Sequence, residues 1–510
     1  MCQPEPESLE TAHVTARRIP RMQGIDGLRA IAVAAVFVYH ANASWLPGGF
    51  LGVDVFFVIS GLLITSLLLA EYADTGRIAL GGFWLRRGRR LLPAVFALLG
   101  VCLLVAATVA RHRLDVRGDA VAAMFYVSNW KFVFEQQNYF DQFGSPPVLQ
   151  HLWSLAVEEQ FYLLWPILLL VGLRFVPRRL PLLVGSAVLA STALMWALYE
   201  RSDPSRAYYG TDTRMAPLLV GALLAFFWKP GALPSVRRPR GRVALDALSV
   251  AALSAVALSF FLVDSGQAAL YHGAFLALAA CTALLLACVV HPASSAGRVL
   301  EQPTLRWLGE RSYAIYLWHW PVIVLTLSNL TDDIHAGVLL AVQLAATLAL
   351  ADLSYRLVER PIRRGALRRV KVRVPHLAAG ARVSVIAGTT GVAALLALVV
   401  ATPPSRTALP PGFTAPVLLA SNRSGEQLAQ LPRAAPATRR AAPSSAAKAV
   451  DGAKPVPQTG PILAIGDSVM LGASSALAAA LGRNLRIDAV VARQADDTID
   501  RILAYQDPSG

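Results

Sequence analysis

The sequence predicts an α-helical polytopic membrane protein, followed by an extramembrane linker and the start of an α/β domain. Of its 510 residues, 55% are hydrophobic and only 15% are charged, whereas soluble domains are nearer one quarter charged. The mean hydropathy of +0.50 agrees with this class. Apolar segments long enough to cross a bilayer also recur between short basic connections.

Eleven apolar segments are predicted to span the membrane. They lie at 25–44, 50–70, 92–110, 154–173, 182–199, 214–228, 245–263, 269–290, 313–329, 336–356 and 382–401. Basic runs such as RRIPR, LRRGRR, RFVPRR, RRPRGR and RLVERPIRRGALRRVKVR fall in connections on one side. The positive-inside rule then places the N-terminus in the cytoplasm and the C-terminus outside the cytoplasmic membrane. Counting 120–134 as a further span would put the most basic run outside, so a re-entrant or surface helix is expected there.

Charge and cysteine content exclude two other classes of protein. The net charge of +15 does not indicate nucleic-acid binding, because the basic residues lie between apolar segments. Three of the four cysteines lie within apolar segments, and no Cys/His spacing is typical of a metal site. The N-terminal 24 residues lack the apolar region of a cleavable signal peptide.

The first apolar segment carries two ionisable residues, Arg29 and His40. A charge at the centre of a membrane helix costs about 2.5–3.5 kcal/mol on insertion scales. Eleven residues at 100° each leave the two side chains about 20° apart on one helix face, and about 16 Å apart along the axis. A snorkelling arginine and a satisfied core histidine would be the structural explanation. The shared face also suggests a functional pair.

The predicted topology sorts other ionisable residues by depth. Asp54, Glu158 and Glu159 are expected in the outer half with His40, whereas Tyr313, Tyr316 and His319 are expected in the inner half. Structural roles are open for each: Asp54 could neutralise an arginine of another span, one glutamate could cap its helix, and His319 could belong to an interfacial aromatic belt. The run Arg86-Arg87-Gly88-Arg89-Arg90 could be a topology signal or an anion site.

Five stretches carry a resemblance to a known family. They are IDGLRAIAVAAVFVYH, GGFLGVDVFFVISGLLI, LRRGRRLLPA, HLWSLAVEEQFYLLWP and GERSYAIYLWHWPV. In content and order they resemble the acyltransferase 3 family of membrane O-acyltransferases over residues 24–364, and Arg29 and His40 match its Arg-x10-His pattern. The resemblance implies a ten-helix core that takes an acyl group, usually acetyl, from cytoplasmic acyl-CoA. The acceptor would be a hydroxyl of an extracytoplasmic or lipid-linked glycan or glycolipid.

The resemblance and the chemistry together assign candidate roles. His40 would act as a base or as a transient acyl carrier, with Arg29 deeper on the same helix and Asp54 or Glu158 orienting the imidazole. Because CoA carries phosphates, Arg86, Arg87 and Arg90 are expected to bind it, and His319 is grouped with them. No permanently bound cofactor and no metal are expected; acyl-CoA is a co-substrate. The other partners would be an envelope glycan or glycolipid and the bilayer, and no nucleic acid.

The predicted boundaries follow from composition. They are 1–24, a cytoplasmic segment; 25–364, the acyltransferase membrane core; 365–381, a basic cytoplasmic connection; 382–401, the eleventh span; 402–460, a Pro/Ala-rich extracytoplasmic linker; and 461–510, a partial α/β domain.

The last piece resembles the start of an SGNH-type hydrolase or transferase domain. Ile465-Gly466-Asp467-Ser468 matches its first block, with a strand predicted before Asp467 and a helix after Ser468. Such a domain needs a histidine near its end, and no histidine follows His376. About 50 residues are also too few for the usual sandwich. Ser468 is therefore not expected to be a working nucleophile in this chain alone, although a partner chain could complete the domain.

Two other functions are weighed against the acyltransferase. A glycolipid or glycan transporter or flippase would use the intramembrane arginines, histidines and carboxylates as a proton relay. The family motifs and the lack of a visible inverted repeat favour the acyltransferase. An outer-surface esterase is disfavoured by the missing histidine.

Overall fold

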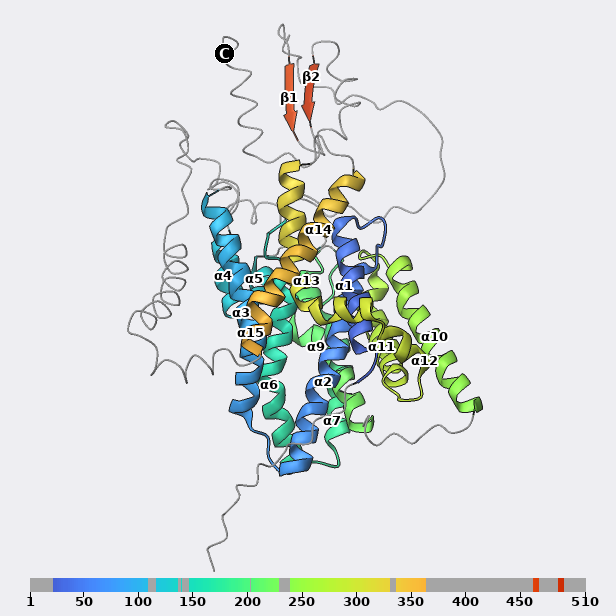
Figure 1. Ribbon diagram of the computed structural model, residues 1–510. Coiled ribbons are helices and arrows are strands. Elements are labelled where there is room, and N and C mark those ends of the chain that lie inside the picture. Colours follow the sequence, from blue (N-terminus) through green and yellow to red (C-terminus); the bar gives the residue numbers. More distant parts are fainter. Residues whose placement is uncertain are drawn as a thin grey trace, which may run out of the picture. The chain divides into compact units, whose positions relative to one another are not determined.

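A computed structural model describes residues 22–108, 116–135, 139, 146–201, 203–228, 239–330, 336–363, 462–466 and 485–489. Contacts within the chain divide it into two units, Met1–Thr402 and Pro403–Gly510. The described part of the first unit is all helical, and that of the second is a pair of strands (Figure 1).

The helices of the first unit alternate long segments with short connecting turns. In chain order they are α1 (Ile25–Ala41), η1 (Gly49–Leu51), α2 (Gly52–Thr75), α3 (Leu80–Thr108), α4 (Arg117–Met124), α5 (Ser128–Phe134), α6 (Leu152–Phe175), α7 (Leu180–Ala197), α8 (Ser205–Tyr209), α9 (Thr211–Phe227), α10 (Pro239–Leu262), η3 (Leu270–Ala274), α11 (Phe275–Val289), α12 (Ser295–Leu300), α13 (Pro303–Leu330), α14 (Ala336–Ser354), η4 (Tyr355–Glu359) and α15 (Arg360–Arg363).

The helical polytopic membrane class is confirmed. Seven helical segments among the described residues are long and apolar enough to cross a membrane: Gly49–Thr75, Leu80–Thr108, Leu152–Phe175, Leu180–Ala197, Arg240–Leu262, Leu270–Val289 and Ala336–Ile362. Helices α1, α9 and α13 occupy three further predicted positions. The predicted eleventh span, 382–401, the basic connection before it and the linker after it lie outside the described residues.

The segment 120–134 forms two short helices instead of a span. Helix α4 ends at Met124 and α5 begins at Ser128. Between them Tyr126 adopts a left-handed backbone conformation, with φ of 54°, which is uncommon for a residue that is not glycine. The break leaves two helices of eight and seven residues, each too short to cross a bilayer alone.

Helices α2 and α9 approach each other closely through two glycines. A Cβ atom added at Gly61 would lie 1.9 Å from the carbonyl oxygen of Leu218, and one at Gly221 would lie 2.0 Å from that of Val58. Only glycine therefore permits this backbone approach, as is usual where membrane helices meet closely. In contrast, only 22% of the most apolar stretch of α10 and 17% of that of α14 are buried inside the protein, against 61% for the segment that contains α2. Both helices carry exposed large apolar residues, among them Leu248 and Val250 of α10 and Leu344 and Leu353 of α14, and α10 lies at one edge of the bundle (Figure 1).

Four long helices contain an internal proline: Pro93 in α3, Pro166 in α6, Pro217 in α9 and Pro321 in α13. Each proline leaves a carbonyl four residues earlier without its helical N–H partner. In α6, α9 and α13, a side chain from another helix or its N-terminal turn donates to that carbonyl. The pairs are Trp84 Nε1 to Tyr162 O at 3.2 Å for Pro166, Ser191 Oγ to Thr213 O at 3.1 Å for Pro217, and His151 Nε2 to Leu317 O at 3.1 Å for Pro321. Since lipid offers no substitute donor, the bundle supplies its own.

The second unit contains two described strands, β1 (Ile462–Gly466) and β2 (Leu485–Ala489). They pair in parallel, with Ile462 opposite Leu485. The strand predicted before Asp467 is thus confirmed, and a parallel pair requires a crossover connection between its strands. The predicted helix after Ser468 lies outside the described residues.

Candidate active site

The last turn of α1 places His40 in a directed chain of hydrogen bonds. A carbonyl oxygen only accepts, so Nδ1 of His319 donates to the Tyr316 carbonyl at 2.6 Å. In neutral imidazoles the second nitrogen then accepts, so Nδ1 of His40 donates to Nε2 of His319 at 2.9 Å. Nε2 of His40 is left as the acceptor for the Tyr139 hydroxyl at 2.6 Å. This chain fixes both tautomers and keeps a lone pair of His40 directed at a hydroxyl.

Aromatic rings surround that hydroxyl. Tyr139 stacks on Tyr208 with ring centroids 5.0 Å apart, and its ring lies 6.0 Å from that of Trp153. The Trp320 ring lies 4.6 Å from His40. Trp153 and Tyr208 are both fully buried. The surroundings are of low polarity, which strengthens the hydrogen bonds between the few polar groups enclosed there.

A third histidine, His151, lies beside the pair. It precedes α6 and is buried, and its ring centroid is 5.6 Å from that of His319. Its Nε2 donates to the Leu317 carbonyl, and its own carbonyl accepts from the Tyr316 hydroxyl at 2.9 Å. The side chains of His40, His151, His319 and Tyr316 therefore connect α1, the start of α6 and α13.

A pocket opens on the side of this cluster toward Arg29. Its polar lining includes Arg29, Arg87, Arg90, Glu158, Tyr162 and Tyr316. Three arginines against one glutamate make the lining basic, which suits a phosphorylated ligand. The guanidinium of Arg87 stacks on the Tyr162 ring at 4.9 Å, and the Glu158 carboxylate accepts hydrogen bonds from the Tyr162 and Ser60 hydroxyls.

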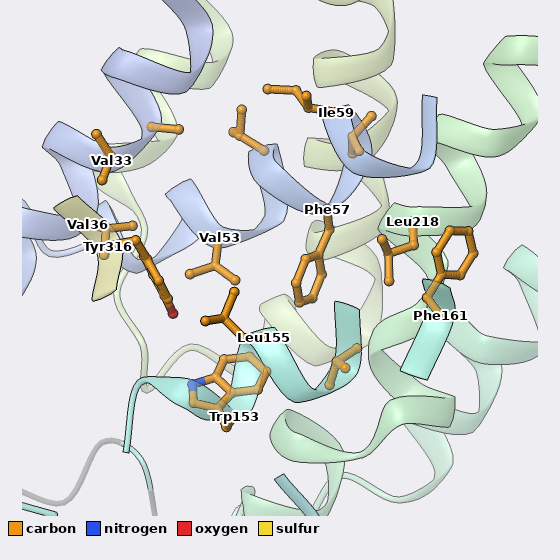
Figure 2. Close-up of a cluster of buried hydrophobic side chains, with 14 of the residues drawn as sticks. Val33, Val36, Val53, Phe57, Ile59, Trp153, Leu155, Phe161, Leu218 and Tyr316 are labelled. Atoms are coloured by element: carbon orange, nitrogen blue, oxygen red, sulfur yellow. The ribbon is translucent and has the colours of Figure 1, made fainter. Parts of the chain in front are cut away.

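The pocket's apolar wall comes from α2 and α6. Val53 and Phe57 of α2 and Leu155 of α6 line it together with Tyr316 of α13 (Figure 2). Tyr316 and Ser154 line the pocket and hydrogen bond to each other at 2.6 Å. Because the Tyr316 carbonyl also accepts from His319, the basic pocket borders the histidine cluster at Tyr316.

Neither predicted carboxylate orients His40, because His319 occupies its Nδ1. Asp54 instead pairs with Arg214 of α9 at 3.0 Å, and both side chains are fully buried. Asp54 therefore does not orient His40 here, and its partner is the one that the structural alternative expected, an arginine on another span. Glu158 lies in the basic pocket, and with Glu159 it sits about two turns into α6, away from the cap.

Two residues predicted to bind acyl-CoA lie elsewhere. His319 was grouped with the arginines by its depth, yet it hydrogen bonds to His40, because α13 begins at Pro303, well before the apolar segment does. Arg86 does not line the pocket; it pairs with Glu71 at 3.5 Å with its side chain 58% exposed. Asp467 and Ser468 lie outside the described residues.

The sequence analysis missed two residues of the histidine cluster, Tyr139 and His151, and the ion-pair partner of Asp54, Arg214. Tyr139 lies in a polar connection without periodicity, so no pattern pointed to it. His151 opens the motif HLWSLAVEEQ and Arg214 opens an apolar span; a buried ionisable residue in either place is a signal in itself. Among the described residues, no group of three His, Cys, Asp or Glu side chains could hold a metal ion.

The fold and site define a polytopic membrane protein with an intramembrane histidine cluster beside a basic pocket. Comparison with known families agrees with this class. Residues 22–356 match the family model of the acyltransferase 3 family, described as an acyltransferase domain. The chain belongs to this family.

Its relatives include named bacterial O-acetyltransferases. It is 45% identical over 358 residues to YrhL of Bacillus subtilis, named "Putative peptidoglycan O-acetyltransferase". The aligned residues cover 69% of this chain and 56% of that relative. It is also 45% identical over 347 residues to peptidoglycan O-acetyltransferase OatA of Listeria monocytogenes. Here the aligned residues cover 67% of this chain and 55% of the relative. The chain thus spans a little more than half the length of these relatives. No solved structure matches it.

Proposed function

We propose that this protein is a membrane O-acetyltransferase that moves an acetyl group from cytoplasmic acetyl-CoA to a hydroxyl of an envelope glycan. Peptidoglycan is the first acceptor to consider, because the similar Listeria protein is named for it. The observation that carries the proposal is the placement of His40. Its Nε2 accepts from a hydroxyl, next to a basic pocket able to hold a phosphorylated donor.

The donor would bind with its phosphates at Arg87 and Arg90. Arg29, which lines the same pocket and lies 3.7 Å from Asp26, would act closer to the histidines. The basic connections of the chain support a cytoplasmic position for the arginine-lined end of the pocket and an outward position for His40. The thioester would then extend toward Tyr316, where the pocket meets the histidine cluster.

The hydrogen bonds of His40 support a role as general base. An acceptor hydroxyl in the place of the Tyr139 hydroxyl would donate its proton to Nε2 as its oxygen attacks the thioester carbonyl carbon. The C–S bond then breaks, and the thiolate takes the same proton and leaves as free CoA. His319 accepts from Nδ1 throughout, holding the imidazole in the required tautomer and sharing the transient positive charge.

The C-terminal unit would be the first part of an SGNH-like domain outside the membrane. The strand β1 ends at Gly466, directly before Asp467 and Ser468, and its parallel pairing with β2 is the pattern of an α/β fold.

The test is acetyl-CoA turnover by the purified full chain in nanodiscs. We expect the wild type to release CoA or to transfer label to a glycan acceptor. His40→Ala and Arg29→Ala should abolish this, whereas His272→Ala, which alters an exposed histidine, should not. Turnover by His40→Ala at the wild-type rate would contradict the proposal. Movement of a glycolipid without covalent change would favour the transporter.

A further inference from the structure

We propose that His151 is a positioning residue that replaces the helix hydrogen bond lost at Pro321 and thereby holds His319 toward His40. Nothing in the sequence analysis assigned a role to His151, and the mechanism above does not use it. The inference rests on the proposed function for its effect on rate, but its effect on the histidine pair is independent of any activity.

The need for His151 arises within α13. Pro321 has no N–H, so the carbonyl of Leu317 lacks its partner one turn later. Leu317 is fully buried, and an unpaired carbonyl in such a place costs free energy comparable to a lost hydrogen bond. His151 Nε2 lies 3.1 Å from that carbonyl and donates to it. A turn of α13 that proline would otherwise leave loose is thus tied to the start of α6.

The same residue holds the neighbouring position. The carbonyl of His151 accepts from the Tyr316 hydroxyl at 2.9 Å and from the Ser154 hydroxyl at 3.3 Å. His151 therefore contacts α13 twice, at the backbone of Leu317 and at the side chain of Tyr316. The carbonyl between these two contacts, that of Tyr316, is the one to which His319 donates.

The consequence reaches the reacting histidine through one further bond. A shift of the Tyr316 carbonyl would release Nδ1 of His319 and let the ring take its other tautomer. In that tautomer Nε2 carries the proton and can no longer accept from His40. The ring of His151 also packs edge-on against His319, at an interplanar angle of 82°, and so blocks rotation of that ring.

The test is a double-mutant cycle between His151→Ala and Pro321→Ala in the full chain. Alanine at 321 restores the N–H that the Leu317 carbonyl lacks, so the double variant should recover what His151→Ala loses. His151→Gln, which keeps a side-chain N–H donor, should recover part of it. Ser191→Ala is the matched control, since it removes the donor at another proline, Pro217.

Two measurements read the outcome. Nitrogen-15 spectra of histidine-labelled protein in nanodiscs should show the His319 and His40 tautomers disturbed in His151→Ala, restored in the double variant, and unchanged in Ser191→Ala. In the turnover assay, kcat of His151→Ala should fall by about 100-fold, with KM for acetyl-CoA within about twofold of wild type because the basic pocket is intact.

Failure of the inference can be told from failure of the proposed function. Unchanged histidine spectra in His151→Ala would overturn the positioning role, whatever the activity. Disturbed spectra that Pro321→Ala does not restore would overturn the link to the proline. Spectra that follow the prediction in a protein without acetyl-CoA turnover would support the positioning role and reject the acyltransferase mechanism.

Discussion

The buried pair of Asp54 and Arg214 offers the sharpest test of how the bundle is stabilised. Both side chains are fully buried, and a single contact of 3.0 Å joins them. Replacing Arg214 by methionine would leave a carboxylate in the core without a cation, which costs about 3–5 kcal/mol in buried pairs. The guanidinium also lies 4.2 Å from the Phe275 ring centroid and 5.0 Å from that of Tyr208, so part of the loss is cation–π attraction.

Replacing both partners should behave differently. Among the described residues, Oδ1 of Asp54 and both Nε and Nη1 of Arg214 have no hydrogen-bond partner, so the pair is poorly compensated for its burial. Asp54→Leu with Arg214→Met removes both charges at similar volume. The double variant should therefore regain roughly 3 kcal/mol relative to the sum of the two single changes.

The assay is equilibrium unfolding in mixed micelles, followed by tryptophan fluorescence, since Trp153 lies against Arg214. A double variant no more stable than the sum of its singles would refute the reasoning. Acetyl-CoA turnover by the folded double variant adds a second reading. A well-folded but inactive double variant would return Asp54 to the catalytic role that the sequence analysis gave it.

Three further results are expected. Arg87→Ala should raise KM for acetyl-CoA by about 10-fold or more, since charge-assisted hydrogen bonds contribute about 1.5–3 kcal/mol. Arg86→Ala should leave KM near wild type. Equal effects of the two changes in a titration of rate against acetyl-CoA would contradict the pocket assignment. Gly221→Ala should destabilise the protein by about 1–3 kcal/mol or more, because its methyl group meets a backbone carbonyl; an unchanged unfolding midpoint would show that α2 and α9 can separate. Tyr139→Phe should cost about 0.5–1.5 kcal/mol of stability by removing the hydroxyl bonded to His40; thermal unfolding of this variant against wild type measures it, and a gain in stability would contradict the bond.

Hydropathy located the ten apolar segments between residues 25 and 356 that lie on helices of the described chain, because burial in lipid imposes a simple condition on every segment. Hydropathy and charge together also identified 120–134 as something other than a span, since its polar residues and the parity of the basic runs agree. The eleven-residue spacing of Arg29 and His40 was informative because a helix converts spacing directly into a shared face. The structure accordingly brings both side chains against α13, one in the pocket and one in the histidine pair.

Depth and pairing were less accessible to the sequence. His319 was assigned to the wrong level because helix α13 starts before its apolar stretch does, and hydropathy locates the stretch alone. The partner of Asp54 lies 160 residues away, and no local pattern encodes such a contact. The orientation of His40 by a histidine was missed for a related reason. Carboxylates are the commoner orienting group, and the sequence does not show which side chain lies next to His40.

Three of the four proline-containing helices, α6, α9 and α13, have a consequence for biogenesis. An unmet carbonyl is costly in hydrocarbon, so a helix with an internal proline is a poor candidate to enter the bilayer alone. In each pair the donor precedes the proline in the chain: Trp84 before Pro166, Ser191 before Pro217, and His151 before Pro321. When each proline-containing helix leaves the ribosome, the residue that donates to its unmet carbonyl has already been synthesised. The order of translation thus matches the order in which these helices need one another.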